Sequence, residues 1–493
     1  MKNEPDLQKR NKRAPEDRHD SCLEEKMGLN LFPHLRVRAS RHPWARAIKI
    51  LILTVTILGS VNLRAQTVTA TTQAAVQTSK NPGDELNKDL PHWMQFTFEM
   101  RAREEARTSL EYEAGDNDTY TLTRMRIGLD LKPTNWFHFY VQGQDSHAID
   151  IAPDHATTSL KNTFDLRQGY VELKAGEENW VSLQVGRSEL NLGNQRVVGG
   201  GDWGNVTRTF DVAKIGLGTG GNRVDIFAAT PVIINTNRFD KFDGDPGHNL
   251  YGVYGTLSKL VPQTTIEPYV LWKTLPSVES ETGVVGNADI YTAGALWFGK
   301  LPAGFDYTVE MDRQAGHSST DDISAWAGYW VTGYTVPKVP LKPRFSTEYT
   351  FATGDNSKGD GKVNTFDQVY GAFHNIYGMS DLFGWRNIRH LRTSAEINPR
   401  RTVKVTFDYH FLWLASAHDG LYNASGVEVV DAPTGGALNT NIGHDVDSYV
   451  TFSPRPWLTM GAGWSYLFWG QFLKENAHGI GSSYPWVFCT YRL

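Results

Sequence analysis

Arginine residues recur at alternate positions in two neighbouring segments of the chain. Arg101 and Arg103 lie in the first segment, and Arg124 and Arg126 lie in the second. A guanidinium group stays charged at physiological pH and can hold a carboxylate through two parallel hydrogen bonds. Rings of such cations are one way in which a pore favours anions. If the four side chains share one surface, that surface could therefore bind or conduct a carboxylated molecule.

The spacing of these arginines is that of a β-strand. In residues 96–103, Phe96, Phe98 and Met100 alternate with polar side chains that include Arg101 and Arg103. Successive strand residues point to opposite faces, so the apolar and charged sets separate. The same parity predicts the cations of the polar face as Arg101, Arg103, Arg124, Arg126, Lys132, Lys214, Lys273, Arg344, Arg392 and Lys404.

Arg187 is a further candidate, and the sequence does not decide which face of its strand it occupies. It shares the parity of Leu183 and Val185 and would reach the polar face only through a β-bulge. A simpler role exists for all of these cations, because acids such as Glu99, Asp130 and Glu348 share the polar face and could form ion pairs with them across the strands.

Eighteen segments with strand character cover the chain from residue 94 to the end. Short turns rich in Gly, Pro and Asn alternate with longer polar connections of about nine to more than 30 residues. Regular short–long alternation is typical of an outer-membrane barrel and not of a Greek-key sandwich. We therefore predict an all-β fold, a transmembrane antiparallel barrel of about 18 strands with short periplasmic turns and long extracellular loops. The expected strands are 94–105, 119–132, 136–146, 163–175, 179–190, 208–218, 222–233, 249–259, 264–274, 289–299, 304–313, 323–334, 343–353, 387–398, 401–415, 444–453, 456–470 and 483–493.

Composition agrees with a barrel in contact with outer-membrane lipid. Aromatic residues make up 12% of the 493 residues, yet the mean hydropathy is −0.41. Trp136, Trp180 and Trp457 lie at expected strand ends, where amphipathic rings favour the headgroup level. After residue 65 the chain holds 36 Lys and Arg against 47 Asp and Glu, a formal net charge of −11. This balance argues against a nucleic-acid partner.

The N-terminal part reads as an export signal. A basic stretch that contains Arg36 and Lys49 precedes a short apolar core, and Leu63-Arg64-Ala65 offers a cleavage site before Gln66. We assign 1–65 to an N-terminal extension and signal peptide, 66–92 to a flexible periplasmic lead-in and 93–493 to the barrel. A permanent anchor is the alternative to cleavage, and translation could start at Met1 or at Met27.

Several motifs in order resemble the alginate export porins of Gram-negative outer membranes. They are LRQGYVEL at 166–173, LQVGRSEL at 183–190, GGDWGNV at 200–206, RTFD at 208–211, TFDQVY at 365–370, then His374, Gly378 and Asp381, and GWRN at 384–387. The resemblance implies a monomeric 18-stranded barrel in the cell outer membrane with an electropositive constriction for an anionic polysaccharide. Periplasmic export partners would then be expected. The cargo and the direction of transport are not implied.

Three other functions are compatible with a β-rich chain of this kind. A general or small-solute porin would share the barrel, and a surface adhesin would share it without conducting. We expect no catalysis, because no Gly-x-Ser-x-Gly elbow occurs. We also expect no cofactor and no metal, since the Asp-rich stretch near Asp355 lacks the spacing of a calcium loop. The long segment 354–386 is rich in aromatic residues and is expected to fold over or into the outer mouth.

Overall fold

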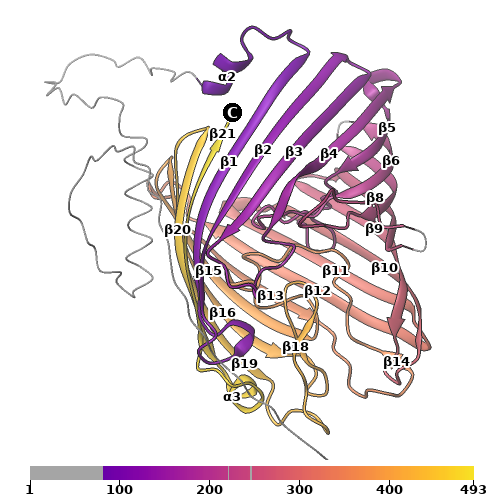
Figure 1. Cartoon of the computed structure of the whole chain (residues 1–493), viewed down its shortest axis with the longest axis vertical. Coiled ribbons are helices and arrows are strands. Elements are labelled where there is room, and N and C mark those ends of the chain that lie inside the picture. Colours follow the sequence, from indigo (N-terminus) through magenta and orange to yellow (C-terminus); the bar gives the residue numbers. More distant parts are fainter. Residues whose placement is uncertain (1–80, 220, 245–246) are drawn as a thin grey trace, which may run out of the picture.

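The chain forms one closed antiparallel β-barrel (Figure 1). The computed structural model describes residues 81–219, 221–244 and 247–493. Each barrel strand is hydrogen-bonded to its neighbours in sequence, and the first strand, β1, also pairs with the last, β21. Closure leaves no free sheet edge in the hydrocarbon. The barrel strands are β1 Met94–Arg107, β2 Asp118–Thr134, β3 Phe137–Ile149, β4 Asn162–Ala175, β5 Val181–Ser188, β6 Phe210–Thr219, β7 Asn222–Pro231, β8 Asn249–Val261, β9 Thr264–Glu279, β10 Val285–Lys300, β11 Phe305–Ser318, β12 Asp321–Thr335, β13 Arg344–Ala352, β15 Ile388–Arg400, β16 Val403–Leu414, β19 Asn441–Arg455, β20 Leu458–Trp469 and β21 Ser482–Arg492.

The predicted barrel of 18 strands is confirmed. The remaining elements are short and lie in the connections or before the barrel. They are α2 Pro82–Asn87, β14 Lys362–Val363, β17 Leu421–Tyr422, β18 Glu428–Val430, α3 Gln471–Asn476 and the single 3₁₀ turns Leu110–Tyr112, Glu177–Asn179 and Pro302–Gly304. No helix among the described residues is both long and apolar enough to cross a bilayer.

Both ends of the described chain lie at the end of the barrel that carries the short turns (Figure 1). The predicted signal and most of the predicted lead-in lie outside the described residues. The last part of that lead-in forms α2 instead of an irregular segment. Asn87 at its end both donates to and accepts from the backbone of Phe96, at distances of 2.9 and 2.7 Å, so α2 is tied to β1.

Alternation along each strand separates a lipid-facing surface from an interior. In β9, Val270 is 54% exposed, whereas the flanking Tyr269 and Leu271 are buried. In β6, Ile215 is 44% exposed and Phe210 is fully buried. The outward apolar residues need no covering protein because lipid is their solvent.

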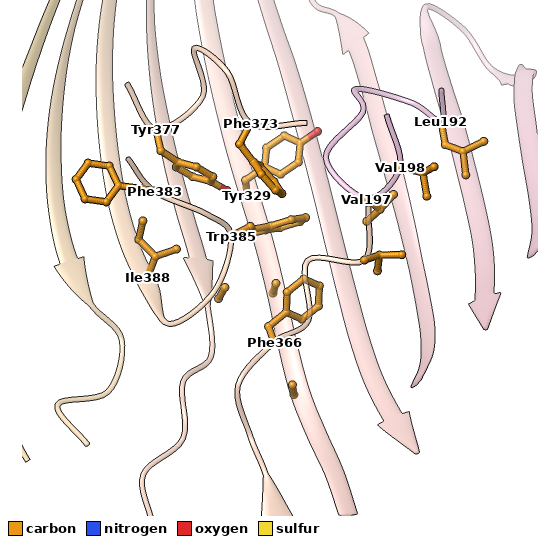
Figure 2. Packing of buried hydrophobic residues seen from close by; sticks show 14 of the residues in the cluster. Leu192, Val197, Val198, Tyr329, Phe366, Phe373, Tyr377, Phe383, Trp385 and Ile388 are labelled. Carbon is orange, nitrogen blue, oxygen red and sulfur yellow. The ribbon is translucent and has the colours of Figure 1, made fainter. Parts of the chain in front are cut away.

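Two long connections fold into the interior. We call residues 189–209, between β5 and β6, the first lumen loop, and residues 353–387, between β13 and β15, the second lumen loop. Figure 2 shows Phe366, Phe373 and Trp385 of the second loop packed with Val197 of the first inside the strand wall. Segment 354–386 was expected to fold over or into the outer mouth, and of these two possibilities the structure shows the second.

The two lumen loops are also joined through their backbones. The amide of Gly199 donates to the carbonyl of Tyr370 at 3.0 Å, and the amide of Tyr370 donates to the carbonyl of Val197 at 2.9 Å. The amide of Ala372 donates to the carbonyl of Gln195 at 2.9 Å. The loops therefore form one body inside the lumen.

A pair of neighbouring residues on β6 tests the lipid-facing assignment. Ile215→Arg places a charge on the outward face and should lower the free energy of unfolding by about 2–4 kcal/mol near the middle of the bilayer. Lys214→Gln changes the preceding residue, whose side chain faces the lumen, and should lower the free energy of unfolding far less. Urea unfolding of the refolded protein in lipid vesicles measures both. Equal effects would contradict the assigned faces.

Candidate functional site

Four arginines predicted from parity meet on the inner wall of β1 and β2. We call Arg101, Arg103, Arg124 and Arg126 the arginine patch, and each of them is buried. The register explains the grouping, since Arg101 lies opposite Arg124 and the strands continue without a break. Side chains of the same parity on paired strands are neighbours.

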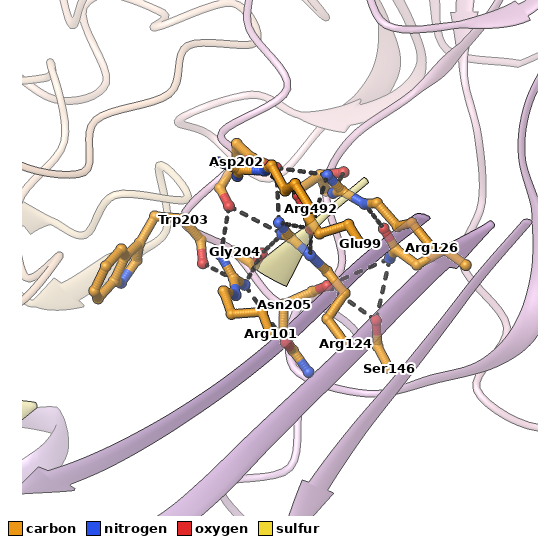
Figure 3. A network of polar contacts seen from close by, with 12 residues as sticks. Glu99, Arg101, Arg124, Arg126, Ser146, Asp202, Trp203, Gly204, Asn205 and Arg492 are labelled. Carbon is orange, nitrogen blue, oxygen red and sulfur yellow. Dashed lines mark hydrogen bonds and ion pairs between the residues drawn. The ribbon is translucent and has the colours of Figure 1, made fainter. Parts of the chain in front are cut away.

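The arginine patch holds the first lumen loop (Figure 3). Arg101 donates to the carbonyl oxygens of Asp202, Trp203 and Gly204 at 2.8–3.0 Å. Arg124 donates to the carbonyls of Asp202 and Gly204 at 3.0 and 2.9 Å. These acceptors are neutral backbone groups, so they do not neutralise the positive charge of the two guanidinium groups.

Two carboxylates compensate part of that charge. Glu99 Oε1 lies 2.6 Å from Arg124 and 3.6 Å from Arg126. Asp202 Oδ1 lies 3.1 Å from Arg124 and 2.8 Å from Arg126. Among the described residues no carboxylate forms an ion pair with Arg101, and its Nε has no hydrogen-bond partner. Arg101 is therefore the least compensated cation of the patch.

The aromatic ring of Trp203 links the arginine patch to both lumen loops. The guanidinium of Arg103 lies over the Trp203 ring, 4.0 Å from its centroid, and also pairs with Glu105 at 2.6 Å. On its other side Trp203 stacks on His374 of the second lumen loop at 4.1 Å. Cation–π and stacking contacts of this kind add to the hydrogen bonds and fix the ring.

Asn205 anchors the far end of the same turn. Its side-chain amide donates to the carbonyls of Thr123, His147 and Leu160 at 2.9–3.1 Å, and the residue is fully buried. Asn205 therefore ties the first lumen loop to β2, β3 and the connection after β3.

A cavity of about 530 Å³ adjoins the arginine patch. Its lining includes Arg103, Arg107, Trp203, Arg208 and His374, contributed by the wall and by both lumen loops. This arrangement combines fixed cations with partly buried aromatic side chains. Chemically it suits a molecule that carries both a carboxylate and an apolar or sugar face.

The structure also shows cations that the parity argument did not select. Arg167 donates to Thr207 Oγ1 at 2.9 Å and pairs with Glu189, both in the first lumen loop. The register of β4 against β3 shifts so that Gln142 pairs with Gln168 and Gly143 with Leu166. Arg167 is thus the extra residue of a β-bulge, which turns it into the lumen. Arg107 has the same parity as Arg101 and Arg103. It was missed because the expected first strand ended at residue 105, whereas β1 continues to Arg107.

Arg187 does not reach the lumen. The pairing of β5 with β4 and β6 runs without a register shift, so Arg187 keeps the outward parity of Val185. There it holds Asp211 through two bonds of 2.9 and 3.1 Å. The bulge that Arg187 would have needed lies in the neighbouring strand β4.

The other predicted cations lie apart from the arginine patch. Lys132 pairs with Asp130 at 2.7 Å and Lys404 pairs with Glu396 at 3.1 Å, both in exposed positions near the short-turn end. Arg344 forks onto Asp306, and Lys214 is half-buried on the lumen side of β6. Arg392 joins Glu348 at 2.7 Å and Lys273 joins Asp367 of the second lumen loop at 2.8 Å. These six are therefore not brought together with the patch.

Comparison with known proteins identifies the family. The sequence model of the alginate export family matches residues 92–487. The chain belongs to the alginate export family. Comparison with curated proteins by sequence finds no match.

Solved structures similar to this alginate export family barrel include porins of Pseudomonas aeruginosa and Acinetobacter baumannii. OccK9 (OpdG) of Pseudomonas aeruginosa has a TM-score of 0.57 at 10% identity, covering 81% of this chain and 98% of that chain. OpdK of the same organism, solved with vanillate, has a TM-score of 0.54 at 9% identity, with coverage of 81% and 98%. OccAB4 of Acinetobacter baumannii has a TM-score of 0.52 at 11% identity, again with 81% and 98%. These likenesses support the fold, and with the family they place the chain in the outer membrane as a porin.

The Asp202 carboxylate gives the docked loop a dependence on pH. Burial alone would raise the pKa of Asp202, but Arg124 and Arg126 lower it to about 2 from 3.8. A lowered pKa stabilises docking fully above the unfolded value, and this contribution is lost as the pH falls from about 4 towards 2.

We therefore expect the first lumen loop to loosen in acid. Single-channel conductance in planar bilayers should rise or become noisier between pH 5 and pH 2.5 in the wild type. Asp202→Asn should show the same behaviour already at pH 5, because its side chain carries no charge to lose. Identical traces of the two proteins at both pH values would exclude Asp202 as the titrating group.

Proposed function

We propose that this porin provides a diffusion path for an anionic polysaccharide or a related anionic solute, with the arginine patch as its charged contact. The observation that carries the proposal is Arg101, a buried guanidinium that donates to three neutral carbonyls and pairs with no described carboxylate. A uronate carboxylate would be a stronger acceptor than a carbonyl because the hydrogen bond is then charge-assisted.

Passage of a polymer requires the first lumen loop to move. With the loop in place, the patch is covered by Asp202, Trp203 and Gly204. An incoming chain of uronates would replace these acceptors and the Asp202 carboxylate by its own carboxylates, so the exchange conserves charge compensation. Displacing the loop then costs only the difference in free energy between the loop's contacts and the uronate's contacts. It does not cost the full free energy of leaving the arginines without acceptors.

A small-solute porin is the second candidate, favoured by the size of the cavity. A volume of about 530 Å³ fits a molecule of drug-like size without any loop movement. The similar barrel of OpdK was solved with vanillate, a small aromatic carboxylate. Of the patch only Arg103 lines this cavity, so the small-solute path uses Arg103 with the loop in place, whereas the polymer path also uses Arg101 and needs the loop to open.

Ion selectivity and block test the charged contact. Conductance of the wild type should favour anions, and oligomers of uronate should block it from the micromolar to millimolar range. Arg101→Gln combined with Arg103→Gln should weaken the block by at least tenfold, since two charge-assisted contacts are lost. Arg313→Gln, on the outward face of β11, removes a cation without touching the lumen and is the matched control.

Cation selectivity of the wild type without any block by uronates would exclude the anionic path. Block by monomeric carboxylates but not by oligomers would favour the small-solute porin over polysaccharide passage.

Loop movement is tested separately through Asn205. Asn205→Ala removes the side-chain amide that donates to three carbonyls of the wall and of the connection after β3, and of the patch it touches only a long contact, 3.5 Å, from Arg101 to Asn205 Oδ1. Its mean conductance should exceed that of the wild type, and block by long uronate chains should become faster. Asn191→Ala, near the start of the same loop, leaves those three bonds in place and serves as control. Unchanged conductance in the Asn205 variant would show that the loop does not limit the path.

The remaining expectations follow from the same proposal. We propose that the barrel acts as a monomer, without catalysis, and that any partner that delivers polysaccharide meets it at the end with the short turns, where both described chain ends lie.

A further inference from the structure

A cluster of acids and histidines lies in the strand wall away from the arginine patch. Asp408 and His410 point inward from β16, and Asp447 points inward from β19. All three are buried to 2% exposure or less. Strand pairing brings them together, because Asp408 lies opposite Asp447 and His410 lies opposite Asp445. One ligand atom from each of the three lies within 4.8 Å of the others.

The cluster contains polar atoms that nothing described satisfies. Asp408 Oδ1 and Asp447 Oδ1 have no hydrogen-bond partner among the described residues. His410 Nε2 lies 3.2 Å from Asp447 Oδ2, yet the two atoms do not form a hydrogen bond. Unpaired buried carboxylates are costly, because the charged form loses its hydration without gaining a partner.

We propose that Asp408, His410 and Asp447 bind a divalent transition ion of the zinc class. One imidazole and two carboxylates match the nitrogen and oxygen ligands of such ions and neutralise a double positive charge. Bonds of about 2.0–2.1 Å in a tetrahedral site place ligand atoms roughly 3.3 Å apart. The separation of His410 Nε2 from Asp447 Oδ2, 3.2 Å, agrees with this requirement.

The surroundings of His410 prepare it as a ligand. Its Nδ1 lies 2.9 Å from Nε2 of His390, and the two rings are stacked. If His410 Nδ1 carries the proton and donates to His390, then His410 Nε2 presents its lone pair to the two carboxylates. A second ring that fixes the tautomer in this way is usual around metal-bound histidines.

The site also touches the second lumen loop. The amide of Met379 donates to Asp447 Oδ2 at 3.1 Å. A bound ion would therefore lie where that loop meets the wall, a structural position that does not depend on the cargo of the pore. This proposed metal site departs from the expectation of no metal. The sequence did not indicate it, because the spacing of Asp408, His410 and Asp447 matches no short motif.

Metal content and cobalt spectroscopy test the site. Untagged protein is refolded in detergent, stripped with a chelator and titrated with Zn²⁺ or with Co²⁺, whose visible absorption reports nitrogen and oxygen ligation. The wild type should bind about one ion per chain. His410→Gln and Asp447→Asn should lose at least 100-fold in affinity, and His390→Gln should lose about 10–100-fold.

Matched variants separate binding from folding. Asp312→Asn removes a buried lumen carboxylate on β11, and His444→Gln removes an outward imidazole on β19, so both should bind like the wild type. The shift of folded barrel on unheated gels verifies folding of every variant. Absence of saturable Zn²⁺ and Co²⁺ binding by folded wild type would overturn the proposal, as would unchanged binding by His410→Gln. Stoichiometric displacement of Co²⁺ by excess Ca²⁺ would overturn the assigned class of ion.

Discussion

The width of an 18-stranded barrel is the constraint on which the rest of the structure depends. Side chains of the wall can fill the interior of a small barrel, but at this strand number they leave an open channel unless something else enters. Here the first and second lumen loops enter, pack together through residues such as Val197 and Trp385, and bond through Val197, Gly199 and Tyr370. What the pore admits is therefore decided by how these loops are held.

The arginine patch and the first lumen loop act as one unit. The loop supplies carbonyl acceptors that keep the buried side chains of Arg101 and Arg124 hydrogen-bonded. The arginines in turn hold a loop whose own backbone would otherwise have unsatisfied carbonyls. Because the arginines and the loop carbonyls satisfy one another, an anion that competes for the arginines would also act on the loop. In the proposed function, this shared set of hydrogen bonds would couple selectivity to opening of the loop.

Strand periodicity allowed the barrel and the faces of most cations to be predicted, because alternation depends only on neighbours in sequence. Three features depended on more distant contacts and could not be predicted. The β4 bulge that turns Arg167 inward is set by pairing with Gln142 and Gly143. The role of Asn205 requires three strand and loop carbonyls that meet only in the closed barrel. The cluster around His410 depends on the register of β16 against β19, which no short motif encodes.

The acidic balance of the chain does not decide the selectivity of its lumen. Charges farther apart than about 8 Å are largely screened at physiological ionic strength, so an ion in the narrow part responds mainly to groups beside it. Around the patch, six arginines share Glu99, Glu105, Glu189 and Asp202 among the described ion pairs, and a seventh, Arg101, pairs with none. The six are Arg103, Arg107, Arg124, Arg126, Arg167 and Arg492. The local field is positive although the chain after residue 65 carries a formal charge of −11. Displacing the first lumen loop would take away the Asp202 carboxylate and the backbone carbonyls that the wall arginines now contact, along with the loop's own Arg196 and Arg208. Arg101, Arg124 and Arg126 would then lack these acceptors, so an anion that supplied new ones would stabilise the open state by binding to it.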